Sequence, residues 1–272
     1  MDTESSRPEH ALFTREGDWC IPTAYTTGPW RTDAMHGGPP SALMGLGIHA
    51  ALLPGEQVAR VSIDLEKPVP LVPMQTQVTR RQVSRRVAHL DVRLLTEGGV
   101  VASGRALLLL GQGPVPLIEV ETPELPPLPP TESVAPGSSS AHDLPLIFHR
   151  DAIEARFTTG DWSTPGPSSA WMRMTTALIA GEDTNALSQM LAVADFGSPL
   201  SQRVQPGTGQ ALINVDVNVT LAGTPTGPWF CLQTQGDVSD AGIGLAVTRF
   251  SDAAGFLGVI TQSQIVYAFA RS

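Results

Sequence analysis

Hydrophobic and polar residues along this chain follow two kinds of pattern, and each predicts a type of element. Between Ala211 and Leu221, apolar residues alternate with asparagine, aspartate and threonine, which is the period-two pattern of a strand whose two faces differ. Other β-rich runs are bounded by proline or glycine, residues that interrupt strands. These runs predict strands over residues 58–66, 74–81, 87–96, 100–110, 229–237, 244–251 and 256–269.

Two segments have the character of buried helices. The first begins at the Gly-Gly-Pro-Pro of residues 37–40, a helix start signal, and is expected to run to about Leu53. It is apolar nearly all round, so we expect a sheet to cover it. The corresponding helix of the second half is predicted over residues 185–194. Many strands with one helix per half favour an α+β fold, because parallel crossovers would need more helices.

A proline-rich segment over residues 111–145 divides the chain. Its prolines block the hydrogen bonds of a sheet and its Gly-Ser-Ser-Ser run adds flexibility, so we predict a linker. The sequence therefore predicts an N-terminal domain over residues 1–110 and a C-terminal domain over residues 146–272. The tripeptide Gly-Asp-Trp occurs once in each half, which is in keeping with a duplicated unit.

Charge and composition narrow the class of protein. The net charge of −9 argues against a general nucleic-acid binder, which would carry a basic face. The acidic start of the chain lacks the order of a signal peptide, and the apolar stretch over residues 41–53 is too short to span a bilayer. We therefore expect a cytoplasmic protein.

The sequence contains little that indicates a metal or a cofactor. Cys20 and Cys231 are the two cysteines, and neither lies in a CxxC motif. There is also no GxSxG elbow, P-loop, dinucleotide-binding glycine motif or HExxH motif. We therefore expect no metal and no cofactor, and serine hydrolases, nucleotide binders and zincins lose support.

Five short motifs carry a family resemblance through their order along the chain. They are His36-Gly37-Gly38, residues 60–70, Leu191-Ala-Val-Ala-Asp195-Phe196, Ile213-Asn-Val-Asp216 and Thr261-Gln262-Ser263. Together they resemble the acyl-CoA thioesterase II and related thioesterase-like families. The resemblance implies a double hotdog, with two antiparallel sheets that each wrap a central helix. It also implies an acyl-CoA thioesterase that hydrolyses a fatty acyl thioester with water activated by an aspartate.

Three residues match catalytic positions of that family. Asp195 ends an apolar helix, where partial desolvation would make its carboxylate a better base; a helix-terminal aspartate that turns into solvent is the alternative. Asn214 stands where the family frequently has threonine, and it can still donate a hydrogen bond to water. Gln262 matches a glutamine of the final strand that orients the water, although Gln262 and Gln264 can equally be ordinary strand residues.

The residues before the first helix are candidates for substrate binding. Gly37 and Gly38 precede a helix N-terminus, which offers N–H groups and a positive dipole end to a thioester carbonyl oxygen. The two prolines that follow carry no N–H, so the donors are few. His36 is a candidate neutral donor, or else a capping or packing residue. Because this helix contains no acid, we expect one catalytic centre per chain.

Two other functions stay open at the level of sequence. Hydratases and dehydratases of the hotdog superfamily need an Asp–His or His–Glu pair near the helix, whereas His142 and His149 lie in or beside the linker, so we expect no such pair. A non-catalytic protein that binds acyl-CoA or lipid would keep the hydrophobic tunnel without the catalytic geometry. The expected partner is an acyl-CoA, and the resemblance allows a homo-oligomer.

Overall fold

The computed structural model of the chain describes residues 10–116, 118, 124–128, 146–205 and 208–268. Most of the predicted linker over residues 111–145 therefore lies outside the described residues, and the division of the chain at this linker stays a prediction. None of the helices in the described part is long and apolar enough to cross a membrane.

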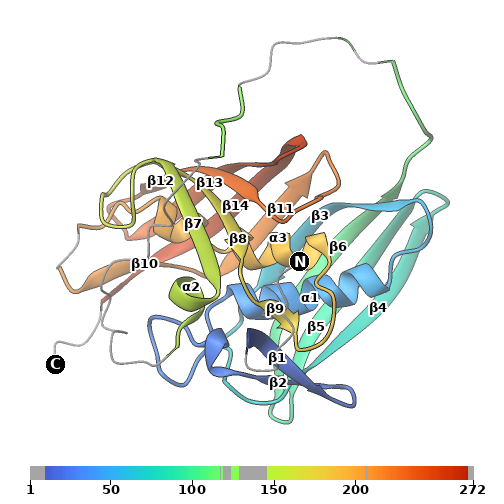
Figure 1. Cartoon of the computed structure of the whole chain (residues 1–272), viewed down its shortest axis with the longest axis horizontal. Helices are drawn as coiled ribbons and strands as arrows, with labels where there is room; N and C mark the ends of the chain where they lie inside the picture. The colour runs from blue at the N-terminus through green and yellow to red at the C-terminus, as the bar shows by residue number, and fades with distance from the viewer. Residues whose placement is uncertain (1–9, 117, 119–123, 129–145, 206–207, 269–272) are drawn as a thin grey trace.

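The first half contains a short hairpin, a long helix and four long strands (Figure 1). The hairpin and its extension are β1 (Ala11–Glu16), β2 (Trp19–Pro22) and the 3-10 helix η3 (Ala24–Thr26). The remaining elements are α1 (Gly38–Ala50), β3 (Glu56–Asp64), β4 (Gln75–Ser84), β5 (Val87–Thr96) and β6 (Gly99–Leu110). The helix and the four strands predicted from the sequence are confirmed close to their predicted bounds.

The second half repeats this order with additional short elements. Before its main helix come α2 (Phe148–Asp151), β7 (Ile153–Thr159), β8 (Ser168–Met174) and β9 (Ala177–Ile179). The helices α3 (Ala186–Ala194) and α4 (Gly197–Leu200) follow. The last strands are β10 (Gln210–Asn214), β11 (Asp216–Leu221), β12 (Phe230–Val238), β13 (Ile243–Asp252) and β14 (Gly255–Ala268). No bounds were predicted for α2, β7, β8, β9 and α4.

The strands of both halves belong to one continuous sheet of eleven strands. Its order is β4-β5-β6-β3-β11-β14-β13-β12-β8-β7, with β10 also paired to β14. The halves join where β3 and β11 pair antiparallel, so that Asp64 lies opposite Asp216 and Val61 opposite Val219. The two antiparallel sheets that the resemblance implies are therefore joined edge to edge into one. The edge strand of each half pairs with the other, which satisfies backbone groups that two separate sheets would leave exposed.

A second, smaller sheet ties the start of the chain to its second half. β1 pairs antiparallel with β2 and parallel with β9, where Phe13 lies opposite Ile179. The Ala180 N–H extends this contact by donating to the Phe13 carbonyl at 2.9 Å. Phe13 and Ile179 are buried in the common core. The halves thus share a core as well as a sheet.

The two long helices pack against each other on one face of the large sheet (Figure 1). A Cβ added to Gly45 would lie 3.0 Å from Leu191 Cδ1, and one added to Gly38 would lie 2.6 Å from the Ala192 carbonyl oxygen. Glycine at these positions lets the backbones approach closely. The Cβ at Gly45 would also lie 3.1 Å from Ser188 Cα, so the later residue of α1 lies beside the earlier part of α3 and the helices run antiparallel. The N-terminus of α1 therefore lies beside the C-terminus of α3.

The strand predicted over residues 211–221 is interrupted at Val215. β10 ends at Asn214 and β11 begins at Asp216, and the pairing with β14 slips by one residue between them. Val215 is 47% exposed, whereas Leu212 before the break and Val217 after it are buried. The single apolar face predicted for this segment is therefore wrong, because the extra residue reverses which side chains point inward.

Candidate active site

Asp195 is the C-cap residue of α3 and lies almost entirely inside the protein, with 4% of its surface exposed. One carboxylate oxygen, Oδ2, lies 2.9 Å from Nδ1 of His36, which directly precedes the first turn of α1. The two residues come from different halves and meet because the helices are antiparallel. The alternative that Asp195 turns into solvent is therefore excluded by its burial.

Asn214 holds the other oxygen of the same carboxylate. Its Nδ2 donates to Asp195 Oδ1 at 2.8 Å. Asn214 reaches inward because the chain breaks after it at Val215, as described above. Both oxygens of a buried carboxylate are therefore fixed by polar groups, which offsets the cost of removing that carboxylate from water.

Gln262 lies beside this pair and bonds the main chain of Asp195. Its Nε2 donates to the main-chain carbonyl of Asp195 at 3.2 Å and leaves the carboxylate to the other two residues. Its Oε1 is buried and has no partner among the described residues. Gln264, two residues along the same face of β14, donates instead to Ser198 Oγ at 2.9 Å. Gln262 is thus the one of the two glutamines that contacts Asp195.

The backbone at Gly37 passes close to the carboxylate. A Cβ at this position would lie 2.7 Å from Asp195 Oδ2 and 2.8 Å from Oδ1, too close for any side chain. At Gly38, the N–H points at His36 Nδ1, 3.1 Å away, and an added Cβ would meet the ring of Phe148 at 2.6 Å. Both glycines are therefore needed for the close approach of α1 to α3 and α2.

Aromatic rings enclose the histidine on two sides. The ring centroids of Phe148 and Phe196 each lie 5.0 Å from that of His36. Trp162 extends this cluster, at 6.0 Å from Phe196. Phe148, Trp162 and Phe196 all come from the second half, which therefore supplies the apolar wall around a histidine of the first half.

A second histidine borders the site. The ring centroid of His149, in α2, lies 6.0 Å from that of His36. Burial lowers the pKa of His149 to about 3, with smaller contributions from His36 and Arg150, so the ring is neutral near pH 7. Its Nδ1 is buried without a partner among the described residues.

The expectation that no Asp–His pair lies near a helix is therefore wrong. The pair is formed by His36 and Asp195, which are 195 − 36 = 159 residues apart in sequence. His149, assigned to the border of the linker, reaches the same region because α2 docks on the first half. This docking includes a hydrogen bond of 2.9 Å from the Phe148 N–H to the Thr27 carbonyl.

Among the described residues of the first half, no carboxylate occupies the position that corresponds to Asp195. Gly37 and Asn185 are the N-cap residues of α1 and α3. Counting ten residues from each cap leads to Gly47 in α1 and to Asp195 in the second half. A Cβ at Gly47 would lie 2.6 Å from Thr76 Cγ2, so this position leaves no room for a side chain. This comparison supports one catalytic centre per chain.

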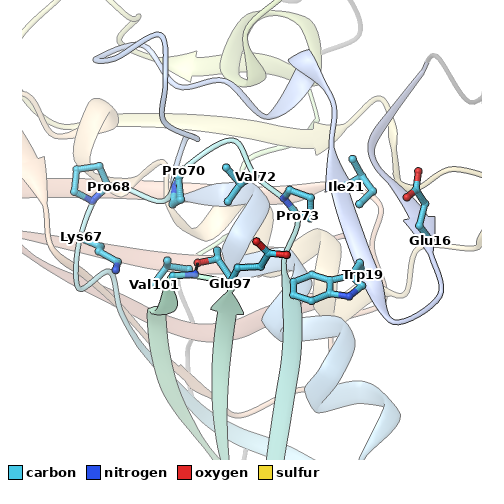
Figure 2. Close-up of a pocket in the computed structure, with 12 residues that line it drawn as sticks. Glu16, Trp19, Ile21, Lys67, Pro68, Pro70, Val72, Pro73, Glu97 and Val101 are labelled. Carbon is cyan, nitrogen blue, oxygen red and sulfur yellow. Dashed lines mark hydrogen bonds between the residues drawn. The ribbon is translucent and has the colours of Figure 1, made fainter.

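A cavity of 790 Å³ lies elsewhere, between the β1–β2 hairpin, the β3–β4 connection and the β5–β6 turn (Figure 2). Trp19, Pro70 and Val101 form part of its apolar lining, and Lys67 and Glu97 its polar part. Neither Asp195 nor any residue that bonds it lines this cavity. The candidate site is therefore identified by the contacts of the Asp195 carboxylate, and it does not coincide with this cavity.

Several solved structures resemble the chain over nearly its whole length. A protein with a hot dog fold from Alicyclobacillus acidocaldarius has 16% identity and a TM-score of 0.66, covering 97% of this chain and 98% of that one. The acyl-CoA thioesterase II TesB2 of Mycobacterium marinum has 12% identity and a TM-score of 0.62, covering 97% of each chain. The TesB protein of Mycobacterium avium subspecies paratuberculosis has 15% identity and a TM-score of 0.62, covering 94% and 96%. These likenesses define a hotdog fold.

The family follows from two matches along the sequence. The acyl-CoA thioesterase N-terminal domain matches residues 26–109, and the acyl-CoA thioesterase C-terminal domain matches residues 122–266. The second match alone covers more than half of the 272 residues. The chain belongs to the acyl-CoA thioesterase family, a family of thioester hydrolases. No curated protein sequence matches it significantly.

Proposed function

We propose that the protein hydrolyses acyl-CoA thioesters by using Asp195 to activate a water molecule. The observation that carries this proposal is the buried carboxylate, which Asn214 and His36 hold at 2.8 and 2.9 Å beside the N-terminus of α1. A base must be fixed within reach of the water that it deprotonates, and hydrogen-bond donors must lie where negative charge develops. Asp195 is fixed in this way by its two partners, and the α1 N-terminus supplies a hydrogen-bond donor.

The reaction balances with these residues alone. Asp195 takes a proton from water as the water oxygen bonds to the thioester carbon, and Gln262 Oε1 accepts the second O–H of that water. The carbonyl oxygen becomes an oxyanion near the Gly37 N–H. The carbon–sulfur bond then breaks, and the proton on Asp195 passes to the thiolate. The products are a carboxylic acid and coenzyme A thiol.

His36 orients the carboxylate in this scheme. Its Nδ1 faces both Asp195 Oδ2 and the Gly38 N–H, but a single nitrogen cannot donate to the first and accept from the second at once. An ionised Asp195 favours the tautomer in which Nδ1 carries the proton and donates to it. When Asp195 takes a proton from water, Nδ1 keeps its own proton and continues to donate to Oδ2.

A non-catalytic acyl-binding protein explains these contacts less well. A hydrophobic tunnel binds an acyl chain without needing a buried carboxylate, whose desolvation costs several kcal/mol unless it is well paired. The chain nevertheless buries Asp195 and supplies two polar partners for it. This arrangement favours an enzyme.

Hydration of a 2-enoyl thioester is a second candidate, because the His36–Asp195 pair is the arrangement that such chemistry uses. In that reaction the water oxygen bonds to carbon 3 and a proton is added at carbon 2. Incubation with a medium-chain 2-enoyl-CoA separates the two activities, since hydration removes the enoyl absorbance without releasing thiol, whereas hydrolysis releases thiol.

The direct test of the proposal is release of free thiol from a panel of short-, medium- and long-chain acyl-CoAs. We expect turnover of at least one chain length, with kcat lowered roughly 10²- to 10⁴-fold in Asp195→Asn. Gln262→Ala should also lose activity, while the matched control Gln264→Ala should retain it, because Gln264 bonds Ser198 and does not contact Asp195. Binding of an acyl-CoA without any thiol release would support the acyl-binding alternative instead.

A further inference from the structure

The N-terminus of α1 offers few N–H groups to an oxyanion. Pro39 and Pro40 have none. The Gly38 N–H points at His36 Nδ1, and the Ser41 N–H donates to the Gly37 carbonyl at 3.3 Å. Among the described residues, the Gly37 N–H is the one at this helix end that is directed at no other group, since the Gly38 N–H faces the His36 ring whichever tautomer that ring adopts. Stabilisation of a tetrahedral intermediate by enzymes of this chemistry generally uses more than one donor, so a second donor is needed.

His149 is a polar side chain near this site to which the proposed reaction gives no role. It is 9% exposed, and its Nδ1 is buried without a partner in the part of the chain that the structure describes. Its ring centroid is 6.0 Å from that of His36, farther than the 5.0 Å at which Phe148 and Phe196 pack on the same ring. A buried polar atom of this kind costs roughly 1–3 kcal/mol, which indicates a use for it.

We propose that His149 is a catalytic residue whose Nδ1–H donates to the thioester carbonyl oxygen as this oxygen becomes an oxyanion. His149 thereby replaces donors that the two prolines remove from the helix end. This inference rests on the proposed thioesterase function, and it assigns a role to a residue that lies outside the motifs of the sequence.

The neutral state of His149 suits this role. A charged imidazole so close to the His36–Asp195 pair would attract the carboxylate and weaken it as a base. The charged neighbours of His149 do not favour protonation: its own segment contributes Arg150 and Asp151, which are paired at 2.8 Å, and the segment that precedes α1 contributes His36. A neutral N–H can still donate to an oxyanion, and its donation strengthens as negative charge develops.

Three substitutions at residue 149 separate catalysis from packing. Asn carries its amide nitrogen two bonds from Cβ, as His carries Nδ1, whereas Gln places its amide one bond farther out, at the depth of Nε2. Phe keeps a ring of similar shape without any polar atom. We expect His149→Phe to lower kcat roughly 10²- to 10³-fold with KM nearly unchanged. We expect His149→Asn to stay within about tenfold of the native kcat, and His149→Gln to resemble Phe.

The outcomes distinguish this inference from the function on which it rests. If the native protein releases no thiol from any acyl-CoA, both are overturned. If the native protein is active and Asp195→Asn is not, a folded His149→Phe variant with native kcat overturns the role of His149 alone. Phe can replace His149 in packing but cannot donate a hydrogen bond, so such a result would show that only packing is needed there. Should the Phe variant not fold, the comparison of Asn with Gln decides: equal kcat values for these two would contradict the role of Nδ1.

Discussion

Replacing Gly37 with alanine should disable the site without disturbing the backbone. Gly37 has φ −67° and ψ −21°, ordinary helical values that alanine adopts without strain. The added Cβ would lie 2.7 Å from Asp195 Oδ2, whereas ordinary contacts begin at 3.4 Å. The carboxylate must therefore retreat by about 3.4 − 2.7 = 0.7 Å. A retreat of this size away from His36 would lengthen their 2.9 Å contact to about 3.6 Å, beyond hydrogen-bonding range.

The size of the effect follows from the bond that is lost. A hydrogen bond to a charged group contributes about 1.5–3 kcal/mol, and each 1.4 kcal/mol is a factor of ten, so kcat should fall by roughly 10- to 150-fold. The assay is thiol release from the best acyl-CoA of the panel, with thermal unfolding measured alongside. Gly47→Ala is the matched control, because Gly47 lies on the same helix and its added Cβ would crowd Thr76 of β4, away from Asp195. Native kcat in Gly37→Ala would refute the reasoning.

Three further predictions address the site and its surroundings. Asn214→Ala should lower kcat and destabilise the fold by roughly 1–3 kcal/mol, measured by chemical denaturation, because one oxygen of buried Asp195 loses its donor. Burial raises the pKa of Cys20 and raises that of Cys231 to about 11, so neither thiol should react with a thiol reagent at pH 8 until the protein unfolds; rapid labelling of the native protein would contradict this. The pKa of His149 is about 6.5 unfolded and about 3 folded, so the unfolded state binds more protons as the pH falls. Stability should therefore decrease from pH 6.5 towards pH 3, with a shallower decrease in His149→Phe; equal slopes would show that His149 is not the group responsible.

Most of the fold could be predicted from the period of the hydrophobic residues and from the prolines and glycines that interrupt it. The alternation of apolar residues and the prolines and glycines between them placed α1 and the long strands close to their observed bounds. The short strands β7, β8 and β9 were missed. The register in which β3 pairs with β11 could not be derived, because an edge strand carries no sequence signal for the partner that will cover it.

The candidate site could be predicted only residue by residue. His36, Asp195, Asn214 and Gln262 were each singled out, and the structure brings them together. Their contacts could not be derived, because a pair such as His36–Asp195 depends on how two helices from different halves cross. The inward turn of Asn214 depends on a one-residue slip that period-two alternation conceals. His149 followed a proline-rich stretch and gave no signal that it would be buried.

The central claim is that Asp195 is the base of a thioester hydrolase. The measurement that tests it most directly is single-turnover thiol release from one acyl-CoA by the native protein and by Asp195→Asn, each first shown to be folded and to bind the substrate. The account predicts that the variant binds with similar affinity but releases thiol at least about 100-fold more slowly. Equal rates of release from the two proteins would contradict it.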